Sequence, residues 1–435
     1  MTFGAYGIAH ADVLSALREL PDNSCDGLLC DPPYGFSFMG KKWDCDVPSV
    51  DVWREALRVL KPGAALLSFG GARTFHRIAT GIEDAGFELR DCLCWLYAKG
   101  FPKSLNVGLA IDKAAGATRP VTGSRVLTGN AAVSLKDKGG TYGVQVGSAG
   151  NVTVQTTGPA TELAKQWDGY GTALKPGWEP IILARKPLDG TVANNVARWG
   201  VGALAIDACR IGSETMPRSS SRGMPKISDN AAMTGGNYER QIVGEAEGRW
   251  PGNVAMDEEA GAILDAEVGN RPSRPVVTRN GGGNAGGSVF ANRKAGNARP
   301  DTGKHENGGP SRFFFSAKVS TKEREYGCDL LPQRSAGDVT GREEDSAGLD
   351  SPRAGAGRTS GARNHHPTLK PIALAKWLAA LIKPPTPNAT LLVPYSGAGS
   401  EMIGALQAGW PVVFGIEGEE EYVQIAHARI KAWDK

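Results

Sequence analysis

The sequence lacks the features that mark disulfide-bonded, zinc-binding and membrane-spanning proteins. Its seven cysteines are odd in number and include no C-x-x-C pair, which argues against a disulfide framework or a zinc finger and favours a reducing compartment. No apolar run approaches the roughly 20 residues that span a bilayer. The segment "MTFGAYGIAHAD" lacks the basic-then-apolar layout of a signal peptide. We therefore expect a cytoplasmic protein with no membrane partner and no metal site.

A strong charge of either sign is also missing. The sequence has 49 Lys and Arg against 46 Asp and Glu, a net charge of +3, which is too weak by itself to argue for nucleic acid. Glycine and proline are plentiful instead, at 58 and 27 of 435 residues, and predict much loop. A chain of this length allows two domains or one large domain with insertions.

Helix and strand patterns alternate towards both ends of the sequence. Short apolar runs predict strands, and apolar residues that recur every three to four positions predict helices. The predicted strands are 26–30, 64–71, 87–98, 179–187, 391–393 and 412–416, and the predicted helices are 12–20, 49–60, 74–86 and 370–382. Such alternation predicts an α/β fold with a mostly parallel sheet. The pattern weakens between 191 and 363, where Gly-rich segments such as 280–287 indicate loops.

A carboxylate and a phenol follow the predicted strand 26–30 directly. The stretch "CDPPYGF" places Asp31 and Tyr34 around Pro32 and Pro33, and two prolines end a strand and stiffen the corner. In open α/β sheets, ligands bind at the carboxyl ends of the strands. An ordinary strand-ending turn is the alternative interpretation of this corner when it is taken alone.

A second set of ligand-binding features lies near the other end of the sequence. The strand 391–393 is followed by Gly397-Ala398-Gly399 and a helical pattern, so that backbone can approach a ligand at a helix N-terminus. Glu417 ends the next strand about twenty residues later, where an acid can accept hydrogen bonds from ribose hydroxyls. A tight turn with a solvated acid is the alternative. There is no third glycine at the dinucleotide spacing, so a dinucleotide fits poorly.

The two sets of features lie close together if strands of both ends share one sheet. We expect such a sheet from 1–190 and 364–435, with 191–363 inserted between them. The Asp31 carboxylate and the Pro32 carbonyl could then accept hydrogen bonds from the exocyclic amine of a nucleobase and make its nitrogen tetrahedral. Tyr34 offers a face for that base, which must leave the duplex stack. A methyl donor would lie across the glycine loop, in line for attack.

These motifs resemble the S-adenosylmethionine-dependent amino-DNA methyltransferases of the N6-adenine and N4-cytosine type. The catalytic D-P-P-Y comes first, a target-recognition region follows and the cofactor loop comes last, which is the β-class order. The following segments are similar to DNA methylases of bacteriophages and prophages: "CDPPYGFSFMGKKWD", "GFPKSLNVGLAIDK", "EPIILARKPL", "SRFFFSAKVSTKERE" and "HHPTLKPIALAKWLAALIKPP". The resemblance covers both ends of the sequence, and the middle in patches.

The resemblance implies a Rossmann-like methyltransferase sheet that is circularly permuted, with a target-recognition region inserted at 191–363. It implies catalytic roles for Asp31, Pro32, Pro33 and Tyr34. Contacts to S-adenosylmethionine are implied for Asp12, Thr368, Lys370, Pro371, Pro394, Tyr395, Ser396, Gly397, Gly399, Ser400 and Glu417. The candidates for the base pocket are Phe36, Phe38 and Trp43.

The cofactor loop departs from the family pattern D-P-F-x-G-S-G-T-T, because this sequence reads "VPYSGAGSE". Val393 stands where the family has an acid near the amino group of the cofactor, and Glu401 is a candidate replacement. The implied activity is methyl transfer to N6 of adenine, favoured because the motif begins with Asp where many N4-cytosine enzymes carry Ser. N4-cytosine methylation and a non-catalytic DNA-binding relative are the alternatives.

The implied partner is double-stranded DNA, and homodimers occur in this class. The basic stretch 271–324 is a candidate for phosphate contacts, with a solvated surface as the alternative. The resemblance alone suggests a bacterial cell or a phage-infected host as the location. It also suggests a role in restriction–modification or in the protection of phage DNA.

Overall fold

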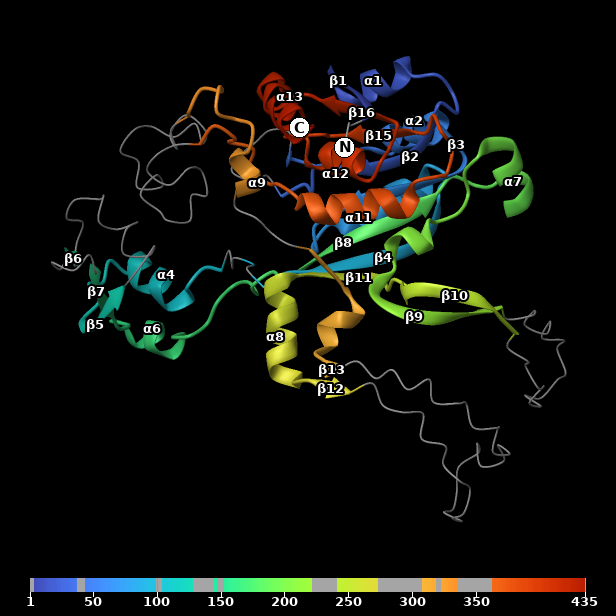
Figure 1. Cartoon of the computed structure of the whole chain (residues 1–435). Coiled ribbons are helices and arrows are strands. Elements are labelled where there is room, and N and C mark those ends of the chain that lie inside the picture. The colour runs from blue at the N-terminus through green and yellow to red at the C-terminus, as the bar shows by residue number, and fades with distance from the viewer. Residues whose placement is uncertain are drawn as a thin grey trace, which may run out of the picture.

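The computed structural model describes residues 4–36, 44–98, 100, 104–127, 144–146, 152–220, 241–272, 307–317, 322–334 and 362–434. A central sheet lies between helices on its two faces, and smaller elements extend from one side of it (Figure 1). Among the helices of these ranges, none has both the length and the apolar character that crossing a bilayer requires.

Nine strands form the central sheet, in the order β1-β16-β15-β2-β3-β8-β4-β11-β14. Their bounds are β1 Ala5–His10, β2 Cys25–Cys30, β3 Leu60–Phe69, β4 Glu88–Leu96, β8 Trp178–Arg185, β11 Val254–Asp257, β14 Phe315–Ala317, β15 Thr390–Pro394 and β16 Val412–Glu417. Neighbouring strands are parallel except at β8, which runs antiparallel to both β3 and β4. The predicted α/β fold with a mostly parallel sheet is confirmed.

Strands from the two ends of the sequence lie side by side in the middle of this sheet. β2 pairs in parallel with β15, and β1 pairs in parallel with β16. The buried Asp26 carboxylate fixes the register of β2 against β15, because it accepts a hydrogen bond of 2.8 Å from the Thr390 amide and one of 2.6 Å from Lys61. The D-P-P-Y corner and the glycine loop therefore follow adjacent strands, as expected for a sheet that both ends build.

Helices cover both faces of the sheet and create two apolar cores. α11 Ile372–Ile382, α12 Ser400–Gln407 and α13 Glu420–Trp433 pack on one face, and α1 Val13–Glu19, α2 Val50–Val59 and α3 Phe75–Asp84 pack on the other. Leu29 and Leu67 enter the first core, whereas Leu28 and Leu66 enter the second. Side chains alternate along a strand, so a sheet covered on both faces needs the unbroken apolar runs that the sequence has here.

The segment 191–363 contributes to the central sheet as well as to separate elements. Its strands β11 and β14 extend the sheet beyond β4. Its other described elements are α7 Val192–Trp199, the 3₁₀ helix η3 Ile206–Cys209, the hairpin of β9 Ile211–Ser220 and β10 Gln241–Arg249, α8 Glu258–Val268, the pair of β12 Arg271–Pro272 and β13 Asn307–Gly308, the 3₁₀ helix η4 Pro310–Phe313, and α9 Lys322–Glu325. Its role in target recognition stays a prediction, and most of the basic stretch 271–324 lies outside the described residues.

The part of the sequence that follows β4 and precedes β8 includes a small unit that lies to one side of the central sheet (Figure 1). It comprises α4 Val107–Ala114, α6 Glu162–Gln166 and a sheet of β5 Val121–Leu127, β6 Val144–Val146 and β7 Val152–Thr157. The buried Asp112 carboxylate accepts hydrogen bonds from the amides of Ala160 and Thr161 and from the Thr161 hydroxyl, and it pairs with Arg119 at 3.0 Å. One buried carboxylate thus ties together a polar, Gly-rich stretch of the sequence.

Candidate active site

The D-P-P-Y corner leaves β2 at the carboxyl edge of the central sheet. Pro32 and Pro33 end the strand, and the chain turns back so that the Tyr34 hydroxyl donates to the Asp31 carboxylate at 2.6 Å. Phe36 packs edge-on against Tyr34 with 5.9 Å between the ring centroids. The guanidinium of Arg73 lies 4.4 Å from the centroid of the Phe36 ring. In this structure Phe36 therefore supports the Tyr34 ring.

A buried cation holds the polar groups of the corner. Lys370 Nζ lies 2.9 Å from Asp31 Oδ2, 3.1 Å from Glu179 Oε2 and 3.0 Å from the Tyr34 hydroxyl. Burial alone lowers the pKa of Lys370, but Asp31 and Glu179 outweigh it and the net pKa is raised, so the ammonium stays charged. Burial, followed by the charges of the same two carboxylates, raises the pKa of Tyr34, so its hydroxyl remains a donor.

Asp44 shapes the backbone behind the corner. Its carboxylate accepts hydrogen bonds from the amides of Tyr34 at 2.8 Å, Gly35 at 3.0 Å and Phe36 at 3.3 Å. Gly35 has a φ of +70°, a conformation that residues with a side chain rarely adopt. The hydroxyl of Thr74, at the start of α3, donates to the Tyr34 carbonyl at 2.7 Å. The corner is thus held by groups outside the D-P-P-Y motif.

We expect Asp44→Ala to loosen the corner. Three backbone amides lose their acceptor, at about 1 kcal/mol for each hydrogen bond, and a displacement of about 1 Å at the reacting groups slows an enzyme about 10²-fold. The activity of the site should fall by about 10- to 100-fold, and hydrogen exchange should speed up at the amides of 34–36. Asp51→Ala, which removes an exposed acid of α2, is the matched control. Unchanged exchange at 34–36 would contradict this role of Asp44.

The glycine loop joins β15 to α12 on the neighbouring strand. Gly397 has a φ of +49° and Gly399 a φ of +79°. A Cβ on Gly397 would lie 2.6 Å from Nε2 of His366, so any larger residue would displace that ring. Tyr395, with a φ of +57°, also has the left-handed conformation, which costs a residue with a side chain energy and is common at ligand sites. The path of the loop therefore depends on its glycines.

Two buried side chains hold the loop from behind. Glu417, at the end of β16, accepts a hydrogen bond of 2.7 Å from the Gly397 amide, and burial raises its pKa. Arg429 of α13 is fully buried and donates to the Ala398 carbonyl and, at 3.1 Å, to the Ser400 hydroxyl. The predicted ribose acid is thus also a support of the loop.

His366 lies against the outer side of the glycine loop. Its Nδ1 is 2.5 Å from the Thr368 carbonyl, and its ring packs edge-on against Tyr422 with 4.6 Å between centroids. Burial lowers the pKa of His366 to about 4, so the ring is neutral at physiological pH. A neutral ring that donates from Nδ1 to a carbonyl keeps a lone pair on Nε2, so His366 presents an acceptor at the site.

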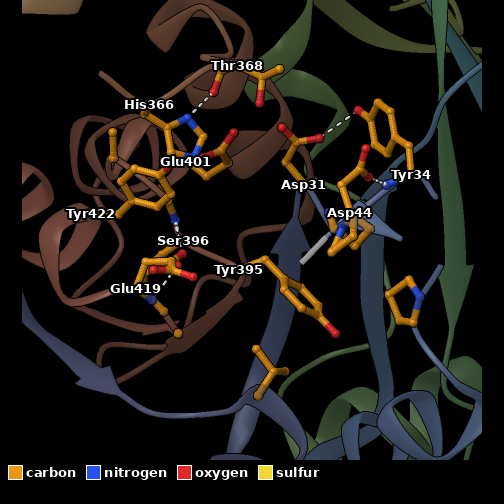
Figure 2. Close-up of a pocket in the computed structure, with 18 of the residues that line it drawn as sticks. Asp31, Tyr34, Asp44, His366, Thr368, Tyr395, Ser396, Glu401, Glu419 and Tyr422 are labelled. Carbon is orange, nitrogen blue, oxygen red and sulfur yellow. Dashed lines mark hydrogen bonds between the residues drawn. The ribbon is translucent and has the colours of Figure 1, made fainter. Parts of the chain in front are cut away.

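The corner and the loop open into one cavity with a volume of about 520 Å³. Figure 2 shows Asp31 and Tyr34 on one side of it and Ser396, Glu419 and Tyr422 on the other. The predicted site residues that line it are Asp12, Asp31, Pro32, Pro33, Tyr34, Phe36, Thr368, Lys370, Tyr395, Ser396, Gly397, Ser400 and Glu417. Clefts of about 300–1,000 Å³ are typical of sites for small ligands and cofactors.

Three predicted residues do not line the cavity. Pro371 precedes α11, Pro394 ends β15, and Gly399 precedes α12. Phe38 and Trp43, the other candidates for the base pocket, lie outside the described residues.

The site includes residues that the sequence analysis does not predict. Asp44 and Tyr422 line the cavity, and Glu179 contacts Lys370. Glu179 begins the predicted strand "EPIILARKP", but a strand pattern does not tell in which direction the strand runs. Because β8 is antiparallel to its neighbours, its first residues lie at the carboxyl edge of the parallel strands and reach the site. Sequence analysis could have found Glu179 by treating a polar residue at either end of a predicted strand as a candidate site residue.

Comparisons with known proteins give structural matches of low similarity. No family model matches the sequence. Similar solved structures include M1.HpyAVI, with 11% identity over 98% of both chains and a TM-score of 0.36. PvuII DNA methyltransferase (cytosine-N4-specific) has 10% identity over 98% of this chain and 87% of that one, with a TM-score of 0.41. TTHA0409 from Thermus thermophilus has 12% identity over 98% and 94%, with a TM-score of 0.33. Similarity this low carries no argument about activity, so the chemistry is derived from the site's own residues.

Proposed function

We propose that the protein transfers a methyl group from S-adenosylmethionine to the exocyclic N6 of adenine in double-stranded DNA. The observation that carries the proposal is the convergence of the D-P-P-Y corner and the glycine loop on one cavity of about 520 Å³. The corner comes first in the sequence and the loop last, which is the β-class order that the motifs resemble.

The residues of the cavity fit a nucleoside cofactor. Gly397 allows close approach of the backbone, and the Glu417 carboxylate at the end of β16 keeps lone pairs for ribose hydroxyls. The Ser396 hydroxyl is buried and has no hydrogen-bond partner among the described residues. When bound, S-adenosylmethionine supplies an electrophilic methyl group on a sulfonium centre. A ligand with hydroxyl groups that fills the cavity can hydrogen-bond to the unpartnered Ser396 hydroxyl and to lone pairs that remain on Glu417.

Asp31 and Pro32 act on the target amine. Such an amine is a weak nucleophile, because its lone pair is delocalised into the ring of the base. An ionised Asp31 and the Pro32 carbonyl can accept its two N–H groups and localise that lone pair on the nitrogen. Lys370 pairs with the Asp31 carboxylate at 2.9 Å, and the Tyr34 hydroxyl donates to it at 2.6 Å, so the carboxylate has one orientation. As the amine gains the methyl group it loses one proton, and the Asp31 carboxylate is in place to accept it.

The Tyr34 ring supports the base pocket. Its hydroxyl is held between Asp31 and Lys370, and Phe36 packs against its edge, so the ring has one orientation. A fixed aromatic face is suited to stacking a base that has left the duplex. Phe36 belongs to this support, and the roles of Phe38 and Trp43 in the pocket stay predictions.

The test is an assay of the purified protein with labelled S-adenosylmethionine and several unmethylated duplex DNAs. The DNA is digested to nucleosides, which are identified by mass spectrometry. N6-methyladenine is the expected product. N4-methylcytosine would keep the mechanism and replace the base. Folded protein that yields no methylated nucleoside would contradict the proposal and favour the non-catalytic DNA-binding relative, for which the buried Val393 is the motivating observation.

The resemblance also carries predictions that the site does not address. These predictions are that the protein is related to phage DNA methylases, that its fold is circularly permuted, that it forms a homodimer, that it is cytoplasmic and that it acts in restriction–modification.

A further inference from the structure

Glu401 is a buried acid on the wall of the cavity. It lies in the first turn of α12, lines the cavity and is 5% exposed. Figure 2 shows it beside His366, on the side of the cavity where Thr368 and Asp31 lie. Val393 is fully buried in the core under α11 and α12 and does not line the cavity. The acid on this wall therefore comes from the helix after the loop.

The Glu401 carboxylate has no cation of its own. In the described part of the chain, no side-chain nitrogen of a Lys, Arg or His lies within 4.0 Å of the Glu401 carboxylate, so Glu401 forms no ion pair there. Lys370 is already held by Asp31, Glu179 and the Tyr34 hydroxyl. Arg429 donates to the Ala398 carbonyl and the Ser400 hydroxyl. Only the backbone amide of Glu401 itself acts as a donor to this carboxylate among the described groups.

Three carboxylates and two cations surround this part of the cavity. Asp31 and Glu179 share Lys370, and Arg429, the other cation whose charge acts on Glu401, donates to the glycine loop, so Glu401 forms no ion pair. Burial, followed by the charge of Asp31, raises the pKa of Glu401 to about 7. A buried carboxylate without a partner destabilises the fold, and a cationic ligand with N–H donors relieves that penalty.

We propose that Glu401 receives the α-ammonium group of the methionine part of the cofactor. The inference rests on the proposed function, because it assumes that the cavity binds S-adenosylmethionine. An ammonium offers N–H donors to a carboxylate with free lone pairs, whereas a sulfonium centre offers none. The ammonium therefore matches Glu401 better than the other cationic centre of the ligand.

The first experiment measures ligand discrimination by calorimetry. The probes are S-adenosylhomocysteine, which has no sulfonium charge, and its analogue with hydrogen in place of the α-amino group. The wild type should bind the first about 10- to 100-fold more tightly, as expected for a buried charge-assisted hydrogen bond. Glu401→Gln should reduce this ratio to less than about threefold by weakening the first ligand alone. Glu420→Gln, an exposed acid of α13 outside the cavity, is the matched control and should keep the ratio.

Two outcomes would distinguish a failure of this inference from a failure of the proposed function. If Glu401→Gln weakens both ligands by the same factor, Glu401 supports the loop and the inference is overturned while the proposed function stands. If the wild type binds neither S-adenosylmethionine nor S-adenosylhomocysteine, the proposed function is overturned and the inference with it.

A second measurement needs no variant to fold. The groups that face Glu401 are Asp31, Tyr34 and Cys30 from β2 and its corner, His366 and Lys370 before α11, and Arg429 of α13. Because its pKa is raised to about 7, Glu401 is partly protonated near neutral pH without ligand, and an ammonium favours its ionised form. Calorimetry in buffers of different ionisation enthalpy should show net release of a fraction of a proton with S-adenosylhomocysteine. The analogue without the amino group should release none, and equal release with both ligands would overturn the inference.

Discussion

Asp31→Asn is expected to reduce methyl transfer by about 10²- to 10⁴-fold, the range found when a group that handles a proton in the transition state is lost. The amide keeps the shape of the side chain and one acceptor oxygen. It removes the negative charge that draws the amine protons, and it cannot take up the proton that the methylated amine sheds. The measurement is single-turnover methylation of duplex DNA, with nucleosides identified by mass spectrometry.

The loss should appear in the rate of the chemical step rather than in cofactor binding. S-adenosylhomocysteine should bind the variant within about threefold of the wild type, because in the proposed mechanism Asp31 acts on the target base. Asp51→Asn, which neutralises an exposed acid of α2 paired with Arg54, is the matched control and should keep full activity. A variant at Asp31 that retains more than about a tenth of the rate would remove this carboxylate from the chemistry.

Lys370→Met is expected to lower the free energy of unfolding by about 3–5 kcal/mol, the usual effect of removing one partner from a buried ion pair. The Lys370 side chain is 5% exposed and contacts Asp31 at 2.9 Å and Glu179 at 3.1 Å. Without it, two carboxylates face one another with no cation between them. Urea denaturation followed by circular dichroism measures the change.

A matched control separates the effect of losing the buried charge from the effect of replacing a lysine side chain by methionine. Lys376→Met removes an exposed lysine from α11 and should change the free energy of unfolding by less than about 0.5 kcal/mol. Adding Glu179→Gln to Lys370→Met removes one of the two unpaired charges, so the double variant should be more stable than Lys370→Met alone. If Lys370→Met destabilised no more than Lys376→Met, the network around Lys370 would contribute nothing to stability.

Local patterns in the sequence are sufficient to predict the two halves of the site. Two prolines after a buried strand predict the corner at Asp31, and glycines between a strand and a helix predict the loop at Gly397. Parallel strands end at the same edge of a sheet, so the two motifs meet once β2 and β15 are neighbours. The expectation that both ends of the sequence build one sheet predicts this proximity, and the structure confirms it.

Other parts of the site depend on tertiary structure that no local pattern reports. Glu179 reaches Lys370 because β8 runs antiparallel, and its apolar run would look the same in either direction. Asp44 caps three amides of a turn ten residues earlier, and an Asp in a polar stretch is an ordinary loop residue by sequence. Glu401 lies in the first turn of α12, where most acids are exposed to solvent, and only the packing of α12 shows that this one is buried.

The pairing of β2 with β15 has a consequence for the order in which the protein acquires its parts. Asp26 and Thr390, which fix this register, are 364 positions apart. At about 5–20 residues per second, a ribosome makes β2 roughly 20–70 s before β15. During that interval one edge of an apolar strand is unpaired, which invites association with other chains. The two strands are also far apart in the sequence, so closing the loop between them is entropically costly and slow. The nascent chain thus has its D-P-P-Y corner long before its glycine loop, and the proposed site is complete only after late folding joins them.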